Sequence, residues 1–198
     1  MARRKSYDRD SAVTAAMHTF WARGYSNTGV RQIERETGIN RFALNTEFNG
    51  KTGLFLEALN AYLAMSRETM LKDLSAGGLD GIRAFLKGLV KGGASDPRRY
   101  GCLMVNTVIE NADLGLEEVR AIATAHFDAL QASFEDALRM AKQNSELPLE
   151  FDIPAAARTL LTFSMGVEVF VRMQEDLGAA QQQVDFLLSL IDRWTETT

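Results

Sequence analysis

The stretch that decides the fold is residues 24–48, GYSNTGVRQIERETGINRFALNTEF. Residues 28–37 and residues 41–48 each repeat apolar side chains at the spacing of one helix face. Gly38 stands between the two segments, where a turn that joins two such helices often contains glycine. The stretch therefore predicts two short helices joined by a tight turn.

The ends of both helices have recognisable signals. The hydroxyl of Thr28 can cap the first helix, and the amide of Asn40 can cap the second, over about Arg41 to Phe48. The predicted inward positions are Val30 and Ile33 on the first helix, and Leu44 and Phe48 on the second. Each helix thus has one face to bury and one face to present.

Longer helices are predicted on both sides. One begins at Asp8 or Arg9, ends at Arg23, and places Val13, Met17 and Phe20 on one stripe. The other begins near Lys51 and has the apolar positions Leu54, Phe55, Ala58, Leu59 and Tyr62. Two short helices braced by a third form the helix-turn-helix plan, in which one short helix lies in a major groove about 12 Å wide.

The rest of the sequence narrows the class of protein. The chain has 198 residues, 46% of them hydrophobic, and its three prolines leave a helical pattern almost throughout. No apolar run approaches the roughly 18–20 residues of a membrane span, so we expect no membrane partner. One cysteine, Cys102, fits a reducing compartment, and we expect a cytoplasmic protein.

Catalytic and metal-binding motifs are missing from the sequence. It has no glycine-rich phosphate loop, no nucleophile elbow and no paired histidine and acid at a useful spacing, so we predict that it is not an enzyme. His18 and His126 are far apart, and no other residues have ligand spacing, so neither a metal nor another cofactor is expected. Cys102 reads as a small buried side chain or, alternatively, as a reactive thiol.

The charges are segregated along the chain. Residues 1–55 hold nine basic and five acidic side chains, whereas residues 56–198 hold thirteen basic and twenty-one acidic ones. A basic end on an acidic body can orient that end toward phosphate. A solvated tail combined with chance is the alternative explanation.

The N-terminal residues resemble the DNA-binding domain of the TetR (tetracycline repressor) family over about residues 8–60. The matching positions are residues 16–20, Gly24, Tyr25, residues 28–30, Ile33, residues 37–40, Leu44, Phe48, Lys51, Leu54 and Phe55. A weaker similarity covers residues 99–110. The resemblance implies an all-α protein of about nine helices, with a helix-turn-helix domain at residues 1–50 and an effector-binding and dimerisation domain at residues 51–198.

The resemblance also implies a DNA-contacting set of side chains. These are Thr28, Arg31, Arg41, Phe42, Asn45, Thr46 and Lys51. Asn45 stands where the family usually has a tyrosine that touches phosphate, and Glu47 adds a negative charge that is tolerable if it faces away or accepts from a cytosine. Arg3, Arg4 and Lys5 form either a loose arm on the DNA or an ordinary basic terminus.

We expect a cavity for a small, partly apolar effector in the second domain. The candidate lining positions are Phe85, Leu89, Met104, Asn106, Thr107, Glu110, Phe127 and Phe163. Asn106, Thr107 and Glu110 are polar groups on an otherwise apolar helix, and such groups need partners when buried. Glu110 could instead pair with Arg120 or Arg172.

The last two predicted helices are apolar around most of their circumference, which indicates self-association as a homodimer. The predicted interface positions are Phe163, Val167, Phe170, Val184, Leu187, Leu188, Ile191 and Trp194. Together these features predict a transcriptional regulator that binds double-stranded operator DNA. The resemblance implies a repressor that its effector releases, with activation as the alternative. The alternative is a helical dimerisation or partner-binding protein whose DNA motif is degenerate.

Overall fold

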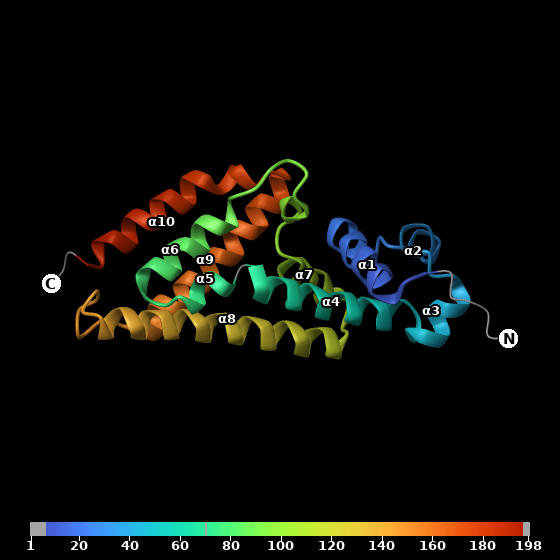
Figure 1. Ribbon diagram of the computed structural model, residues 1–198, viewed down its shortest axis with the longest axis horizontal. Coiled ribbons are helices and arrows are strands. Elements are labelled where there is room, and N and C mark those ends of the chain that lie inside the picture. Colours follow the sequence, from blue (N-terminus) through green and yellow to red (C-terminus); the bar gives the residue numbers. More distant parts are fainter. Residues whose placement is uncertain (1–6, 70, 196–198) are drawn as a thin grey trace.

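The computed structural model describes residues 7–69 and 71–195, and these residues form helices without any β-strand (Figure 1). The elements are α1 (Arg9–Arg23), α2 (Val30–Thr37), α3 (Arg41–Glu47), α4 (Gly50–Thr69), α5 (Leu71–Ser75), α6 (Gly78–Leu89), η1 (Pro97–Tyr100), α7 (Leu103–Leu114), α8 (Glu117–Gln143), α9 (Ile153–Gln174), η2 (Leu177–Ala180) and α10 (Gln181–Arg193). The all-α prediction is confirmed. The described residues include ten α-helices rather than about nine, because the short α5 follows α4.

The first helix begins and ends where its sequence predicts. The Asp8 carboxylate accepts a hydrogen bond from the Ser11 backbone N–H at 2.9 Å, which caps the start of α1. Gly24, with φ +81°, ends it. Met17 and Phe20 are buried as expected, whereas Val13 is only half-buried.

The cap predicted at Thr28 is wrong. Gly29 occupies the cap position of α2 and offers no side chain, while the Thr28 hydroxyl donates to the Gly24 carbonyl at 2.6 Å. Thr28 therefore closes the turn between α1 and α2 from the inside, with none of its surface exposed. The other cap is confirmed, because the Asn40 side-chain oxygen accepts from the Ala43 N–H at 2.9 Å.

Two hydrophobic cores hold the helices. The first joins α1–α4 to the start of α7 and α8, and includes Leu44, Phe48, Leu54 and Phe55. The second joins α5, α6, α8, α9 and α10. Since α8 contributes to both cores, and α7 and α8 enter the first, the helix-turn-helix packs directly on the rest of the chain.

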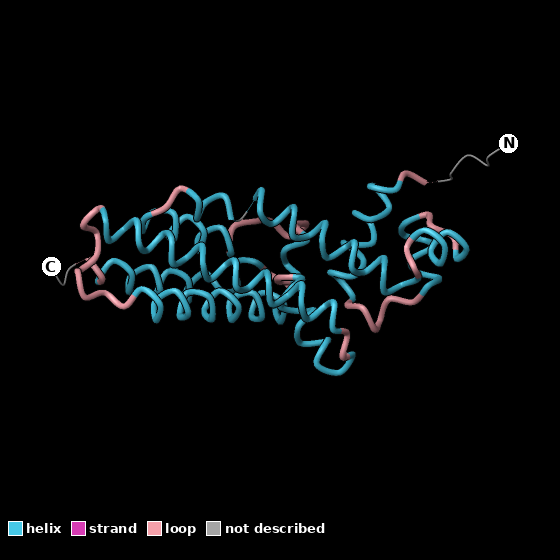
Figure 2. The backbone as a smooth tube through the Cα atoms, turned by 90° about the horizontal axis from the view of Figure 1, so that it is seen from below, coloured by secondary structure: helices cyan, strands magenta, loops and turns pink. Residues whose placement is uncertain are grey.

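The molecule is elongated, with α1, α2 and α3 gathered at one end and α10 ending at the other (Figure 1). The view from below shows most helices of the larger part running along the long axis (Figure 2). Within residues 7–69 and 71–195, no helix combines the length and hydropathy needed to cross a bilayer.

Candidate nucleic-acid interface and effector cavity

Helix α3 separates its side chains into a buried and an exposed face. Ala43 and Leu44 are buried, and Leu44 is only 1% exposed. The opposite face consists of exposed side chains that include most of the predicted DNA-contacting set, Arg41, Phe42, Asn45 and Thr46. Phe42 is 78% exposed, which is unusual for so large an apolar side chain.

The start of α3 is fixed against α2. The Arg41 backbone N–H donates to the Glu34 carboxylate at 2.8 Å, in addition to the Asn40 cap. The Glu34 bond leaves the Arg41 side chain exposed. Carboxylates favour helix N-termini because unpaired N–H groups and the helix dipole are positive there. The start of α3 is thus held to α2 by the bond between the Arg41 backbone N–H and the Glu34 side chain.

Glu47 faces away from the exposed face of α3. Its carboxylate accepts from the Tyr7 hydroxyl at 2.9 Å, and Arg9 approaches its backbone carbonyl at 3.5 Å. Arg9 is held in turn by a two-pronged ion pair with Glu57, with contacts of 2.6 and 2.8 Å. The negative charge of Glu47 is therefore turned toward α1.

The remaining predicted DNA contacts differ in accessibility. Arg31 is exposed on α2. Lys51 is half-buried, with its Nζ 4.1 Å from the centre of the Tyr25 ring, and burial lowers the pKa of its ammonium group. Thr28 is fully buried, so its predicted phosphate contact is wrong for this conformation. Arg3, Arg4 and Lys5 lie outside the described residues.

Three groups of the larger part hold the C-terminal end of α1 and the turn after it, and two of them, Arg172 and Gly101, bind the helix itself. The Arg172 guanidinium of α9 donates to the carbonyls of Trp21 and Ala22, at 3.4 and 2.9 Å. The Trp21 indole N–H donates to the Gly101 carbonyl at 2.6 Å, in a buried bond. The two Arg172 contacts satisfy carbonyls that have no partner within the helix itself.

Glu110 of α7 holds the turn that follows α1. Its two carboxylate oxygens accept from the backbone N–H groups of Tyr25 and Ser26, at 2.8 and 2.7 Å. The structure thus does not bring Glu110 to a ligand cavity, and the suggested pairing with Arg120 or Arg172 is wrong, because those side chains bind elsewhere.

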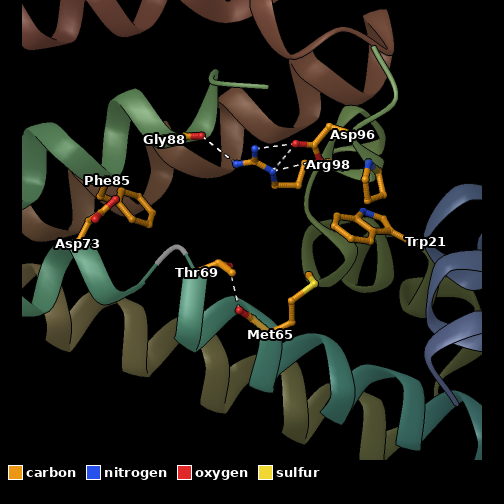
Figure 3. Close-up of a pocket in the computed structure, with 9 residues that line it drawn as sticks. Trp21, Met65, Thr69, Asp73, Phe85, Gly88, Asp96 and Arg98 are labelled. Carbon is orange, nitrogen blue, oxygen red and sulfur yellow. Dashed lines mark hydrogen bonds and ion pairs between the residues drawn. The ribbon is translucent and has the colours of Figure 1, made fainter. Parts of the chain in front are cut away.

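Two neighbouring cavities lie between the helices. The outer cavity, of about 290 Å³, is lined from α1, α4, α5, α6 and η1, and Trp21, Met65, Asp73, Phe85 and Arg98 converge on it (Figure 3). Arg98 is fully engaged there, since it donates to the Asp96 carboxylate and to the carbonyls of Gly88 and Lys91.

The inner cavity, of about 30 Å³, shares Phe85 with the outer one. Its lining residues are Tyr62, Ser66, Leu71, Phe85, Leu89, Cys102, Val105, His126, Phe127, Leu130, Ser164, Met165 and Glu168. Three predicted positions, Phe85, Leu89 and Phe127, meet at this cavity. At its present volume it has room for a few water molecules.

The polar residues of the inner cavity were not predicted from the sequence. The Tyr62 hydroxyl donates to the Cys102 thiol at 3.2 Å, and Glu168 lies beside them, 8% exposed. Burial raises the pKa of Glu168 to about 8 and that of Cys102 to about 11. The Cys102 thiol is therefore protonated near neutral pH, which favours the small buried side chain over the reactive one.

A signal for Glu168 was present in the sequence, because it is the one acidic residue within α9. His126 across the cavity is neutral near pH 7, since burial, with a smaller effect from the nearby Arg67, lowers its pKa to about 4.

Four other predicted cavity positions lie elsewhere. Met104 is fully buried in the core next to α1, and Thr107 is buried without lining either cavity. The Asn106 side chain donates to the Tyr100 carbonyl at 2.8 Å and fastens η1 to α7. Phe163 lines a shallow depression on the outside of α9.

The predicted dimer positions divide into two groups. Val167, Val184, Leu187 and Ile191 are at most 6% exposed and pack in the second core of their own chain, so they are not available to a partner. Phe163, Phe170, Leu188 and Trp194 are half-buried. The apolar side chains that α9 and α10 leave exposed are Val169, Met173 and Phe186, and Phe186 is 64% exposed.

Across residues 7–69 and 71–195, no group of three or more His, Cys, Asp or Glu side chains is placed to hold a metal ion.

Comparison with protein families matches two regions of the chain. Residues 12–58 match the bacterial regulatory proteins of the tetR family, and residues 78–187 match the tetracyclin repressor-like C-terminal domain. The chain belongs to the TetR family. It is therefore a DNA-binding transcription regulator of that family.

Relatives of known sequence or structure resemble this TetR-family chain over nearly its whole length. The HTH-type transcriptional repressor ComR of Escherichia coli (strain K12) is 25% identical, over 98% of this chain and 92% of that protein. A cysteine mutant of the TetR family regulator CifR, solved with a 26bp double-strand operator DNA, has a TM-score of 0.78 at 24% identity, over 98% of both chains. A TetR transcriptional regulator from Chloroflexus aurantiacus J-10-FL has a TM-score of 0.81 at 23% identity, over 92% of this chain and 93% of that one.

We expect Glu110→Ala to loosen the turn after α1, because the N–H groups of Tyr25 and Ser26 lose their acceptor. The expected loss is about 1–3 kcal/mol of unfolding free energy, measured by urea denaturation. Asp113→Ala on the same helix, where the side chain is exposed and has no bonded partner among the described residues, is the matched control. Equal stability of the two variants would contradict the anchoring role of Glu110.

A second prediction concerns pH. Because the pKa of Glu168 is about 8 in the folded chain and 4.5 ordinarily, the stability from its protonated form is complete below pH 4.5 and is lost as the pH rises through about 8. Glu168→Gln cannot ionise, so its melting temperature should gain on that of the wild type as the pH rises from about 4.5 to about 8 and should gain no further above pH 8. The control is Glu150→Gln, an exposed position before α9. A constant difference between wild type and Glu168→Gln across that pH range would refute the assignment.

Proposed function

We propose that the chain is a homodimeric repressor, active in the cytoplasm, that a small organic effector releases from its operator. The observation that carries the proposal is the exposed face of α3, where Arg41, Phe42, Asn45 and Thr46 stand clear of a buried apolar face. We assign the chain a regulatory role and no catalytic one.

The exposed face of α3 suits the major groove. Arginine can bind guanine through two hydrogen bonds, asparagine can bind adenine in the same way, and an apolar side chain such as Phe42 can contact a thymine methyl group. The first residues of a recognition helix make most base contacts, and here they are fixed by the Glu34 and Asn40 bonds. Asn45 thus offers a base or phosphate contact in place of the usual tyrosine.

Charge distribution supports the same orientation. The N-terminal 55 residues carry an excess of four positive charges and the remainder an excess of eight negative ones. Phosphate attracts the first part and repels the second, so the helix-turn-helix end leads the approach to DNA. Glu47 does not oppose this, because its carboxylate is bound to Tyr7. This placement removes one of the reasons to suspect a degenerate motif.

The proposed dimer would use the outer faces of α9 and α10. Val169, Met173 and Phe186 form the exposed apolar part of these faces, and exposed side chains of this kind are enriched where proteins associate. A two-fold axis through this surface pairs two α3 helices, which must reach half-sites about 34–36 Å apart.

The two cavities are the proposed effector site. The outer cavity lies between α1 and the larger part, with Trp21 in its wall, and the inner cavity lies beside it among α4–α9. An occupant can release DNA only by binding one arrangement of α1 and α4 more tightly than the other.

We predict that Arg41→Ala weakens binding to DNA about tenfold or more, because a two-bond arginine contact contributes about 1–3 kcal/mol. The fragment to test is one enriched from genomic DNA by the wild-type protein, and the measurement is a fluorescence anisotropy titration at fixed salt. Arg120→Ala, an exposed arginine on α8, serves as control and should bind normally. Unchanged affinity of Arg41→Ala would remove α3 as the recognition helix.

We predict that Phe186→Lys converts the dimer to monomers, because it replaces the most exposed aromatic side chain of the proposed interface with a charge. Sedimentation velocity at several protein concentrations measures the change. Leu149→Lys, an 82% exposed position outside α9 and α10, should leave the dimer intact. A wild-type monomer, or a Phe186→Lys dimer of undiminished affinity, would contradict the proposed interface.

A further inference from the structure

The carboxyl group of Glu168 is buried in the inner cavity without a partner. Among the described residues it makes no hydrogen bond and no ion pair, and the side chain is only 8% exposed. Among the described residues, every side-chain oxygen or nitrogen that is fully shielded from solvent has a hydrogen-bond partner. The Glu168 oxygens have none, so they are accessible from the cavity that Glu168 lines. A buried carboxyl group of this kind is costly unless something binds it.

The protein does not supply the missing positive charge. Arg98 is the charged group that acts on Glu168, yet its donors are taken by Asp96, Gly88 and Lys91. Arg172, one turn further along α9, donates to carbonyls of α1 instead. Both neighbouring guanidinium groups thus point their donors elsewhere.

The walls of the two cavities suit a cation with an apolar body. Tyr62 and Phe127 line the inner cavity, and Phe85 lies in the wall of both. Aromatic faces attract organic cations as well as apolar groups. Asp73 adds a carboxyl group to the outer cavity, and that carboxyl group also makes no hydrogen bond or ion pair within the described chain. An anionic ligand would meet two carboxyl groups and the neutral His126, and the arginine that lines the outer cavity, Arg98, already has its partners.

We propose that the effector is a small lipophilic organic cation, whose positive charge pairs with Glu168 while its apolar body lies against Phe85 in the outer cavity. This inference rests on the proposed function only in taking the cavities as the effector site. The inner cavity holds a few waters at 30 Å³, so the charged group displaces them and moves Phe85 as it enters.

Glu168 is the group lining the inner cavity that changes its charge near neutral pH. Burial raises the pKa of Tyr62 well above 10 and that of Cys102 to about 11, so both remain protonated, and His126, with a pKa of about 4, remains neutral. Arg98 forms an ion pair with Asp96 at 2.7 Å. Binding of a permanently charged cation must therefore follow the ionisation of Glu168, whose pKa is about 8.

The experiment is a calorimetric titration of the full-length protein, without DNA, with two probes. One is benzyltrimethylammonium, whose charge does not depend on pH, and the other is uncharged benzyl alcohol. We expect affinity for the cation to rise about tenfold per pH unit up to about pH 8 and then to level off, since each step ionises more Glu168. Affinity for benzyl alcohol should not rise with pH.

Matched variants locate the charge contact. Glu168→Gln should lose about tenfold or more of its affinity for the cation, together with its pH dependence, because one pKa unit corresponds to a tenfold change. The same variant should keep its affinity for benzyl alcohol, which shows that the cavity is intact. Asp73→Asn, in the outer cavity, should keep the pH dependence.

Three results would overturn the proposal. They are the absence of saturable binding of the cation, equal affinity of the wild type and Glu168→Gln for it, and a flat pH profile. Because no DNA is present, the proposed function fails separately: a chain that binds the cation at Glu168 but enriches no DNA fragment would refute only the regulatory role.

Discussion

The attachment of the C-terminal end of α1 to the larger part of the molecule is the constraint on which the rest depends. Arg172 binds the last carbonyls of α1, Glu110 binds the N–H groups of the turn that follows, and the Gly101 carbonyl holds the Trp21 indole. The carbonyls at the end of α1 and the N–H groups of the turn after it, which lack partners within the helix, are thus bound by charged side chains from distant helices. Since α2 and α3 are packed on α1 and α4, these bonds set the direction in which the exposed face of α3 points.

The same attachment connects the cavity to the DNA-binding end. Glu168 and Arg172 lie four residues apart on α9, so a shift of α9 at the cavity moves the guanidinium that binds α1. Gly101 is in contact with the same turn, because a Cβ atom there would lie 2.4 Å from the Glu168 carbonyl oxygen. Its left-handed φ of +69° suits glycine as well. Two of the three groups that hold α1 therefore rest on the turn of α9 that lines the cavity.

The sequence foretold the parts of the molecule that depend on local interactions. The ends of α1, α2 and α3 follow from residues such as Gly24, Gly38 and Asn40, whose roles involve neighbours within four residues. The helix cap predicted at Thr28 is wrong because its hydroxyl donates to the Gly24 carbonyl instead. The sequences of α9 and α10 are apolar around most of the helix, so they do not show which face packs on the same chain. Half of the predicted interface positions on these helices therefore lie in the core. Glu110 has its partners 84 and 85 residues away, a distance over which spacing carries no signal.

The bonds between α9 and α1 are strong enough to couple the proposed effector site to the DNA-binding end. Allosteric coupling between two sites commonly amounts to about 1–3 kcal/mol, which changes affinity about five- to 150-fold. A hydrogen bond to a charged group contributes about 1.5–3 kcal/mol, so losing the bond between Arg172 and Ala22 in one of two states would supply a coupling of that size. The proposed cation contact at Glu168 would therefore lie one turn from Arg172, the group of α9 that binds α1.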